Sequence, residues 1–321
     1  MALLGTPEAA VPALRALVGT GHPPALVITP PEKRRGRGAS ATRCPVGAAA
    51  EVLGIPVHAT ADVNDAKSIG ALHARRPDLL VVVAFGQILK KEILALPRLG
   101  ALNLHFSVLP RWRGAAPVQR AIEAGDAVTG VSVQRIVAKL DAGPVIGKRE
   151  LEIGPDERAG ELEARLADIG AALLADVVAH TGDTGTLIEG KPQDASLVTL
   201  APKVGKDEAA PDFRGTPAEF VRRVRAFHPW PLVQGSLASA SRTGPQAVAI
   251  HRARVGVAKR KGTKAAPGVV LAAGRDGIEV ACGAGTVVLT ELQRPGAKVL
   301  GAAAFLNGFP VKAGDRFAAP R

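Results

Sequence analysis

Residues 78–84 constrain the fold more than any other stretch of the sequence. After Asp78, the run Leu-Leu-Val-Val-Val-Ala is wholly apolar and has the length of one strand. Such a run is typical of a central parallel strand that is covered on both faces. Shorter strand patterns at residues 2–4 and 25–29 precede it, with helical patterns between them. This alternation predicts an α/β fold with a doubly wound, mostly parallel, Rossmann-like sheet.

The surrounding segments extend the same pattern. The first helix is predicted to be capped by Thr6 and opened by Pro7, with an apolar stripe of Val11, Leu14, Leu17 and Val18. Further helices are predicted at residues 45–53, 62–75, 117–125 and 157–178, and further strands at 56–57, 102–106, 130–136 and 145–153. Between the second strand and second helix, residues 30–38 combine four basic side chains with glycine and proline. This composition predicts a mobile cationic loop, neither helix nor strand, that orders on phosphates; a merely solvated charge run is the alternative.

The positive charge is concentrated in the last third of the chain. The net charge of the 321 residues is +12; residues 1–204 carry 23 basic and 21 acidic side chains, whereas residues 205–321 carry 18 and 8. The first 204 residues are nearly neutral and the rest of the chain is basic, which suggests a polyanionic partner. The alternative is that the positive charge serves only solubility. The sequence predicts a catalytic domain at residues 1–185, a linker at 186–208 and a smaller domain at 209–321.

Short strands dominate the smaller domain. Apolar runs at residues 247–250, 255–258, 268–271, 278–281 and 286–292, separated by turn signals, predict a small β-barrel of the oligonucleotide-binding (OB-like) kind. Basic residues cluster around one hairpin: Arg252, Arg254, Lys259, Arg260, Lys261 and Lys264. This cluster is the candidate nucleic-acid face, with a solvated loop as the alternative. Aromatic residues are scarce, so backbone contacts should outweigh base stacking.

Several classes of protein are disfavoured by the composition. No apolar run approaches the roughly 20 residues that span a bilayer, and no signal peptide is evident, so we expect a soluble protein. Cys44 and Cys282 lie far apart and show neither metal-ligand spacing nor a disulfide framework, which favours the reducing cytoplasm. The seven histidines form no metal-binding motif, and we expect no metal.

Asn103 and His105 are the first candidate catalytic residues. Side chains two apart on a strand share one face, so both point the same way at the carboxyl end of the strand predicted at 102–106. Open α/β sheets bind ligands at this end. Acyl transfer needs a donor for a developing oxyanion and a group that moves protons near neutral pH, which an amide and an imidazole supply. The alternative is that Asn103 caps a turn and that His105 is a hydrogen-bonded structural residue. Asp141 is a further candidate, and its simplest role is likewise structural, as a turn former.

The wider stretch resembles a known family. Asn103-Leu104-His105, followed by Ser107-Val108-Leu109-Pro110, is similar to the Asn-x-His and Ser-Leu-Leu-Pro signature of folate-dependent formyltransferases. The continuation at residues 111–119 is similar to the branch of the family whose acceptor is methionyl-tRNA. Leu140-Asp141-Ala142-Gly143 resembles the family's Leu-Asp-x-Gly. Further resemblances occur at residues 193–196, 201–203, 227–231 and 314–317.

The resemblance implies a complete set of functional residues. Asn103, His105 and Asp141 would form the catalytic triad, and residues 107–110 (Ser107, Val108, Leu109 and Pro110) would bind 10-formyltetrahydrofolate, the formyl donor. The acceptor would be initiator methionyl-tRNA. Together with the basic cluster, the resemblance gives as candidate tRNA-binding residues Arg35, Arg37, Arg113, Lys203, Arg252, Lys259, Arg260 and Lys261. The expected protein is a cytoplasmic monomer.

Two alternative functions stay open at this point. The same triad could formylate a small amine, such as a purine precursor ribotide or an amino sugar, but a small acceptor has no use for a basic barrel. The chain could also be a non-enzymatic RNA-binding protein whose formyltransferase part only binds folate. The intact set of Asn103, His105 and Asp141 argues against that alternative.

Overall fold

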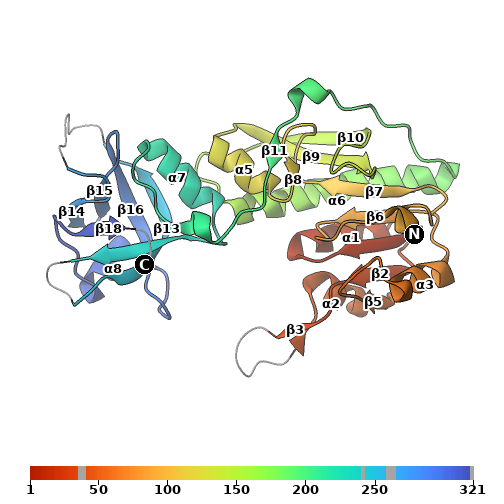
Figure 1. The fold of residues 1–321 in the computed structure, drawn as a ribbon, viewed down its shortest axis with the longest axis horizontal. Helices are drawn as coiled ribbons and strands as arrows, with labels where there is room; N and C mark the ends of the chain where they lie inside the picture. The colour runs from red at the N-terminus through yellow and green to blue at the C-terminus, as the bar shows by residue number, and fades with distance from the viewer. Residues whose placement is uncertain (35–40, 240–242, 258–264, 319–321) are drawn as a thin grey trace. The chain divides into compact units, whose positions relative to one another are not determined.

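The computed structural model describes residues 1–34, 41–239, 243–257 and 265–318, and the chain divides into two compact units (Figure 1). The first unit contains Met1–Pro117, Val128–Glu152 and Glu163–Pro202; the second contains Val118–Ala127, Ile153–Leu162 and Lys203–Arg321. Within the described ranges, no helix is long and apolar enough to cross a membrane. The domain boundaries predicted at residues 185 and 208 stay a prediction.

The first unit is built on a seven-stranded sheet with the order β10-β9-β7-β6-β1-β2-β5. Its strands are β1 (Ala2–Gly5), β2 (Leu26–Thr29), β5 (Val57–Ala59), β6 (Leu80–Val83), β7 (Ala101–His105), β9 (Val128–Arg135) and β10 (Val145–Glu152). The five strands from β5 to β7 in this order pair in parallel, whereas β9 pairs antiparallel with both of its neighbours, β7 and β10. β6, the apolar run, lies at the centre of the order, which confirms the doubly wound, mostly parallel sheet.

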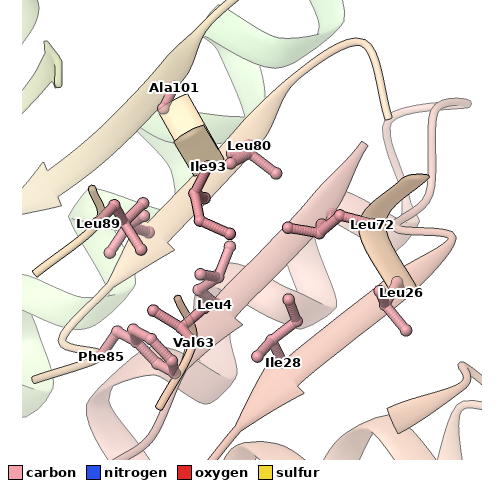
Figure 2. Packing of buried hydrophobic residues seen from close by; sticks show 12 residues of the cluster. Leu4, Leu26, Ile28, Val63, Leu72, Leu80, Phe85, Leu89, Ile93 and Ala101 are labelled. Carbon is pink, nitrogen blue, oxygen red and sulfur yellow. The ribbon is translucent and has the colours of Figure 1, made fainter. Parts of the chain in front are cut away.

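Helices connect and cover these strands (Figure 1). In the first unit they are α1 (Val11–Val18), α2 (Pro45–Val52), α3 (Ala66–Arg75), α4 (Lys91–Leu94) and most of α6 (Ala159–Thr184). α5 (Pro117–Ala124) belongs to the second unit from Val118 onward. On one face of the sheet, Leu4, Ile28 and Leu80 form a buried cluster with Leu72 of α3 and Ile93 of α4 (Figure 2). On β7 and β9, α6 approaches Leu104 and Val131 at Gly170, where an added Cβ would lie 3.0 Å from Leu104 Cδ2. α6 therefore covers the Leu104 side of β7, because neighbouring side chains on a strand point to opposite faces.

Two local predictions are wrong. Thr6 does not cap a helix: its hydroxyl donates to the carbonyl of Phe85 (3.1 Å), and α1 begins at Val11 after a 3-10 turn at Glu8–Ala10. The segment at residues 30–38 was predicted to contain no strand, but Lys33–Arg34 forms strand β3. β3 pairs antiparallel with β4 (Ala41–Thr42). Strand pairing uses backbone groups, so charged side chains do not prevent it. The intervening residues lie outside the described ranges.

The second unit is an antiparallel sheet in the order β14-β15-β16-β13-β12-β18, with β17 paired to β16. Its elements are α7 (Pro217–Ala226), β12 (Val233–Ala238), β13 (Gln246–Val255), β14 (Val270–Gly274), β15 (Gly277–Ala281), β16 (Thr286–Gln293), β17 (Leu300–Gly301), α8 (Ala302–Gly308) and β18 (Arg316–Ala318). A bridge between Val269 and Arg316 joins the two ends of the sheet. The sheet therefore curls round on itself, as expected of an OB-like barrel.

The strand boundaries in this unit differ from the prediction. The run at 247–250 and the beginning of the run at 255–258 belong to one strand, β13, and residue 258 itself lies outside the described ranges. β12 and β18 were not predicted, because small residues make the apolar alternation of Val233–Ala238 weak and β18 has only three residues. Helix α7 follows Thr216, which forms a capping box with Glu219.

Candidate active site

β7 carries Asn103 and His105 to the carboxyl end of the parallel strands. The neighbouring strand β9 places Gln134 opposite Asn103 and Ser132 opposite His105. Paired residues on adjacent strands project from the same face of a sheet, so these four side chains share one side of β7 and β9. This is the side opposite Leu104 and α6, and the strand register therefore produces a polar surface at this edge.

Asp141 completes the group that the sequence predicted. Its Oδ1 accepts hydrogen bonds from Asn103 Nδ2 (3.3 Å) and Gln134 Nε2 (2.9 Å), and its Oδ2 accepts one from the backbone N–H of Gly114 (3.0 Å). The Asp141 side chain is 11% exposed. Three donors from three segments fix the carboxylate, so Asn103, His105 and Asp141 do come together in the structure.

His105 is held mainly by a backbone carbonyl. Its Nε2 donates to Trp112 O (2.8 Å), whereas Nδ1 lies 3.8 Å from Asp141 Oδ2, farther than a hydrogen bond reaches. Because a carbonyl oxygen only accepts, this contact assigns the proton of a neutral imidazole to Nε2. Nδ1 is then the nitrogen with a lone pair, and it lies beside the Asp141 carboxylate.

The loop after β7 is braced by serine hydroxyls. Ser107 Oγ donates to Arg111 O (2.6 Å), Ser132 Oγ donates to Ser107 O (2.8 Å), and Leu109 N donates to Ser132 Oγ (3.1 Å). Ser107 and Leu109 are buried, while Val108 and Pro110 are partly exposed. Of the four predicted folate-binding residues, Ser107 and Leu109 hold the loop in shape, and Val108 and Pro110 present surface.

Comparison with known families places this geometry in context. Residues 1–178 match the model of a family described as formyl transferase, and residues 203–310 match the formyl transferase C-terminal domain. The chain belongs to the formyl transferase family. The two matched ranges together include all three residues of the polar group and most of the curled sheet.

Proteins named methionyl-tRNA formyltransferase are similar to this family member over nearly its whole length. The one from Methylococcus capsulatus is 43% identical over 303 residues, covering 94% of each chain, and the one from Aromatoleum aromaticum is 41% identical over 319 residues, covering 99% of this chain and 97% of its own. Among solved structures, WlaRD, a sugar 3N-formyl transferase, aligns with a TM-score of 0.62 at 16% identity over 92% of this chain and 98% of its own. HypX from Aquifex aeolicus in complex with tetrahydrofolic acid aligns with a TM-score of 0.57 at 18% identity over 100% of this chain and 48% of HypX. At these identities, the two structures support the fold.

Three residues of this formyl transferase site were missed by sequence reasoning. They are Gln134, which bonds Asp141, and Gln193 and Thr199, which come from the segment predicted as a linker. Gln134 lies two residues after Ser132 on one strand face, and this spacing could have indicated it. Gln193 belongs to the stretch at residues 193–196 that resembles the family, but that resemblance gave it no role at the site. Thr199 gave no signal, because its partner Trp112 lies 87 residues away in the chain.

The predicted tRNA-binding residues are in different situations. Arg113 is buried, and its Nε and Nη2 donate to Gln193 Oε1 (3.0 and 2.8 Å), so it supports the site from within. Lys203 is exposed, and Arg252 forms an ion pair with Glu291 (3.2 Å). Residues outside the described ranges are Arg35, Arg37, Lys259, Arg260 and Lys261. The role of all eight in tRNA binding stays a prediction.

Across the ranges that the structure describes, no three His, Cys, Asp or Glu side chains are grouped so that they could hold a metal ion. The chemical groups at the site are an amide, an imidazole and a carboxylate. An amide nitrogen carries two hydrogens, so Asn103 can donate to Asp141 and to a second acceptor at once. The arrangement is suited to stabilising an oxyanion and moving a proton.

Proposed function

We propose that this formyl transferase moves the formyl group of 10-formyltetrahydrofolate to the amino group of the methionine on initiator methionyl-tRNA. One observation carries the proposal: at more than 40% identity, the similarity to proteins named methionyl-tRNA formyltransferase extends through both units of the chain. The grouping of Asn103, His105 and Asp141 supports the chemistry, and the basic last third of the chain supports a nucleic-acid acceptor. We further propose that the protein works as a cytoplasmic monomer.

The proposed reaction is an acyl transfer through a tetrahedral intermediate. The neutral amine of methionine attacks the formyl carbon, and the carbonyl oxygen becomes an oxyanion. The second N–H of Asn103 donates to this oxyanion while the first stays on Asp141 Oδ1. Collapse of the intermediate breaks the bond between the formyl carbon and the folate nitrogen. The products are formylmethionyl-tRNA and tetrahydrofolate.

Proton transfer in this scheme belongs to His105. Nε2 is engaged by Trp112 O, so Nδ1 takes the proton that the attacking amine loses and passes it to the leaving folate nitrogen. While His105 is charged, Asp141 Oδ2 faces it at 3.8 Å and stabilises the imidazolium. Asp141 also aligns Asn103, because the Asn103 amide donates to Asp141 Oδ1. The proton count balances, because the amine loses one proton and the folate nitrogen gains one.

The proposed partners require two kinds of surface. Val108 and Pro110 are the partly exposed residues of the predicted folate-binding loop, and we assign them the contact with 10-formyltetrahydrofolate. Exposed Lys203 and half-buried Arg252 are the described candidates for tRNA contact. For Arg113, burial argues for a supporting role at the site.

The acceptor is tested by a transfer assay with four acceptors. Formyl transfer from 10-formyltetrahydrofolate is measured with methionyl-initiator-tRNA, free methionine, a purine precursor ribotide and an amino sugar nucleotide. We expect transfer to the charged tRNA alone. Transfer only to a small amine would keep the chemistry and overturn the acceptor, and no transfer to any of the four would favour a binding protein without this activity.

A further inference from the structure

The segment from Lys191 to Ala201 is fastened across the candidate active site. At its beginning, Lys191 and Val145 exchange two backbone hydrogen bonds of 2.8 Å. At its end, Leu200–Ala201 forms β11, which pairs in parallel with β8 (Arg113–Gly114). All of these residues belong to the first unit. This segment, whose composition is typical of a linker, therefore lies within the first unit.

Gln193 is the residue of this segment with the most contacts at the site. Its Nε2 donates to the backbone carbonyls of Asp141 (2.8 Å) and Gly143 (2.7 Å), and it lies 3.3 Å from Gln134 Oε1. Its Oε1 accepts from Nε and Nη2 of the buried Arg113. One amide thus connects the turn that carries Asp141 with Arg113 of β8, and the N–H of the next residue in β8, Gly114, holds Asp141 Oδ2.

The turn that carries Asp141 needs such support. Asp141 has a φ of +47°, in the left-handed region that non-glycine residues enter at a cost of about 1–3 kcal/mol. Next to it, Gly143 is packed so tightly that an added Cβ would lie 1.8 Å from Arg135 O. A strained conformation persists only where its surroundings hold it. The two carbonyls that Gln193 binds flank this strained turn.

Thr199 supports His105 in a similar way. Its Oγ1 accepts from Trp112 N (2.9 Å), and its backbone carbonyl accepts from Arg113 N (2.9 Å). Trp112 also has a positive φ, +63°, and its carbonyl accepts the hydrogen bond from His105 Nε2. The orientation of the imidazole therefore depends on a backbone that the same segment fixes.

We propose that Gln193 is a positioning residue for Asp141, and that Thr199 positions His105 through Trp112. Neither side chain needs to touch a substrate, since each acts through the residue that it holds. The inference rests on the proposed function, because it assigns these residues to the formyl-transfer step. Small displacements of reacting groups reduce rates strongly, by about 100-fold for 1 Å.

Gln193→Glu tests the donor function of the amide separately from its acceptor function. Glutamate keeps an acceptor for Arg113 but loses both hydrogen-bond donors to the carbonyls of Asp141 and Gly143. We expect kcat for methionyl-tRNA to fall by about 10- to 100-fold, while KM for tRNA and folate each change by less than about 3-fold. The acidic limb of the kcat pH profile reports the protonation of a group at the site. The negative charge added beside Asp141 should move this limb to higher pH, because it favours the protonated form of that group. Loss of folded protein alone would not move this limb.

Ser196→Ala is the matched control in the same segment. The Ser196 hydroxyl bonds only locally to Asp194 Oδ1 (2.7 Å), and we expect kcat and the pH profile of this variant to equal those of the wild type. Thr199→Val is a second test, because it removes the acceptor for Trp112 N and keeps the branched shape. We expect it to lower kcat by about 10-fold with little change in KM.

The possible outcomes separate this inference from the proposed function. If the wild type transfers formyl to methionyl-tRNA and both Gln193→Glu and Thr199→Val keep kcat within twofold, the positioning role is overturned and the function stands. A fall in kcat that follows the loss of folded protein, with an unchanged pH profile, would overturn it as well. An inactive wild type would overturn the proposed function itself, and the positioning role with it.

Discussion

At the scale of single residues, strained backbone conformations gather at the site. Trp112 and Asp141 have positive φ angles of +63° and +47°; the Trp112 carbonyl binds His105, and the Asp141 carboxylate binds Asn103. The identity of Asn103, His105 and Asp141 could be predicted from short motifs. The positive φ of Trp112 could not, because the contact that holds the Trp112 N–H comes from Thr199, which is 87 residues away in the chain. Such strain is commonly found where geometry serves function.

Gly114 is a residue where this geometry leaves no room for a side chain. Its φ is +128°, an added Cβ would lie 2.5 Å from Ala201 O, and its N–H donates to Asp141 Oδ2. We expect Gly114→Ala to lower the free energy of unfolding by about 1–3 kcal/mol and to reduce kcat, because the β8–β11 pairing must open. Chemical denaturation and the formyl-transfer assay measure the two effects.

Gly185→Ala is the control for backbone strain alone. Gly185 also has a positive φ, +66°, but no heavy atom lies within 4 Å of an added Cβ. We expect this variant to lose only about 1 kcal/mol of stability and no activity. Equal stability losses and equal activities for the two variants would show that the close approach to Ala201 is not important.

At the scale of elements, the sequence predicted the order of strands and helices along the chain better than it predicted which strands pair with each other. The apolar run at residues 78–84 contains β6, and the strand predicted at 102–106 is β7 (Ala101–His105). Periodicity is a local property and predicts such elements well. Pairings such as β8 with β11 depend on contacts between distant two-residue segments, and no periodic pattern indicates them. β12 was missed for a similar reason, since its small residues give weak alternation.

A salt bridge in the second unit ties helix α5 to the segment before α7. Arg120 of α5 donates from Nη1 to Glu208 Oε2 (2.8 Å) and from Nη2 to Glu208 Oε1 (3.0 Å). The two side chains are 12% and 28% exposed. We expect Glu208→Gln to lower the free energy of unfolding by about 1–3 kcal/mol, as is usual for a hydrogen bond to a charged group. Denaturant unfolding at neutral pH measures this loss.

The pH dependence of this bridge has a defined sign. Hydrogen bonding from Arg120 holds the pKa of Glu208 below its usual value of 4.5. A carboxyl with a lowered pKa stabilises the fold fully above its unfolded pKa, and this contribution is lost as the pH falls through its folded pKa. The difference in stability between wild type and Glu208→Gln should therefore narrow below pH 4.5.

Asp212→Asn provides the comparison for Glu208→Gln. Asp212 pairs with Arg214, whose side chain is 85% exposed, and exposed pairs contribute about 0–1 kcal/mol. We expect Asp212→Asn to change the stability at neutral pH by less than Glu208→Gln does. A loss at Asp212 equal to or greater than that at Glu208 would contradict the account of the Arg120 bridge.

At the scale of the whole molecule, the excess positive charge and the candidate active site lie in different parts of the sequence. Asn103, His105 and Asp141 lie in the first 204 residues, which are nearly balanced in charge, and the excess of positive charge lies after them. The sequence alone could predict both the α/β fold and the antiparallel curled sheet. It could not predict that residues 191–201 fasten the site, because linkers and site-bracing segments have similar compositions. Their contacts with Asp141 and Trp112 arise only in the folded chain.

The most direct test of the central claim is the single-turnover rate of formyl transfer to methionyl-tRNA by the wild type and by Asn103→Ala. If Asn103 stabilises the oxyanion, the rate should fall by about 100- to 1,000-fold, while the Kd values for 10-formyltetrahydrofolate and tRNA change little. Unfolding curves confirm that the variant is folded. A folded Asn103→Ala protein that transfers formyl at the wild-type rate would contradict the assignment of this site.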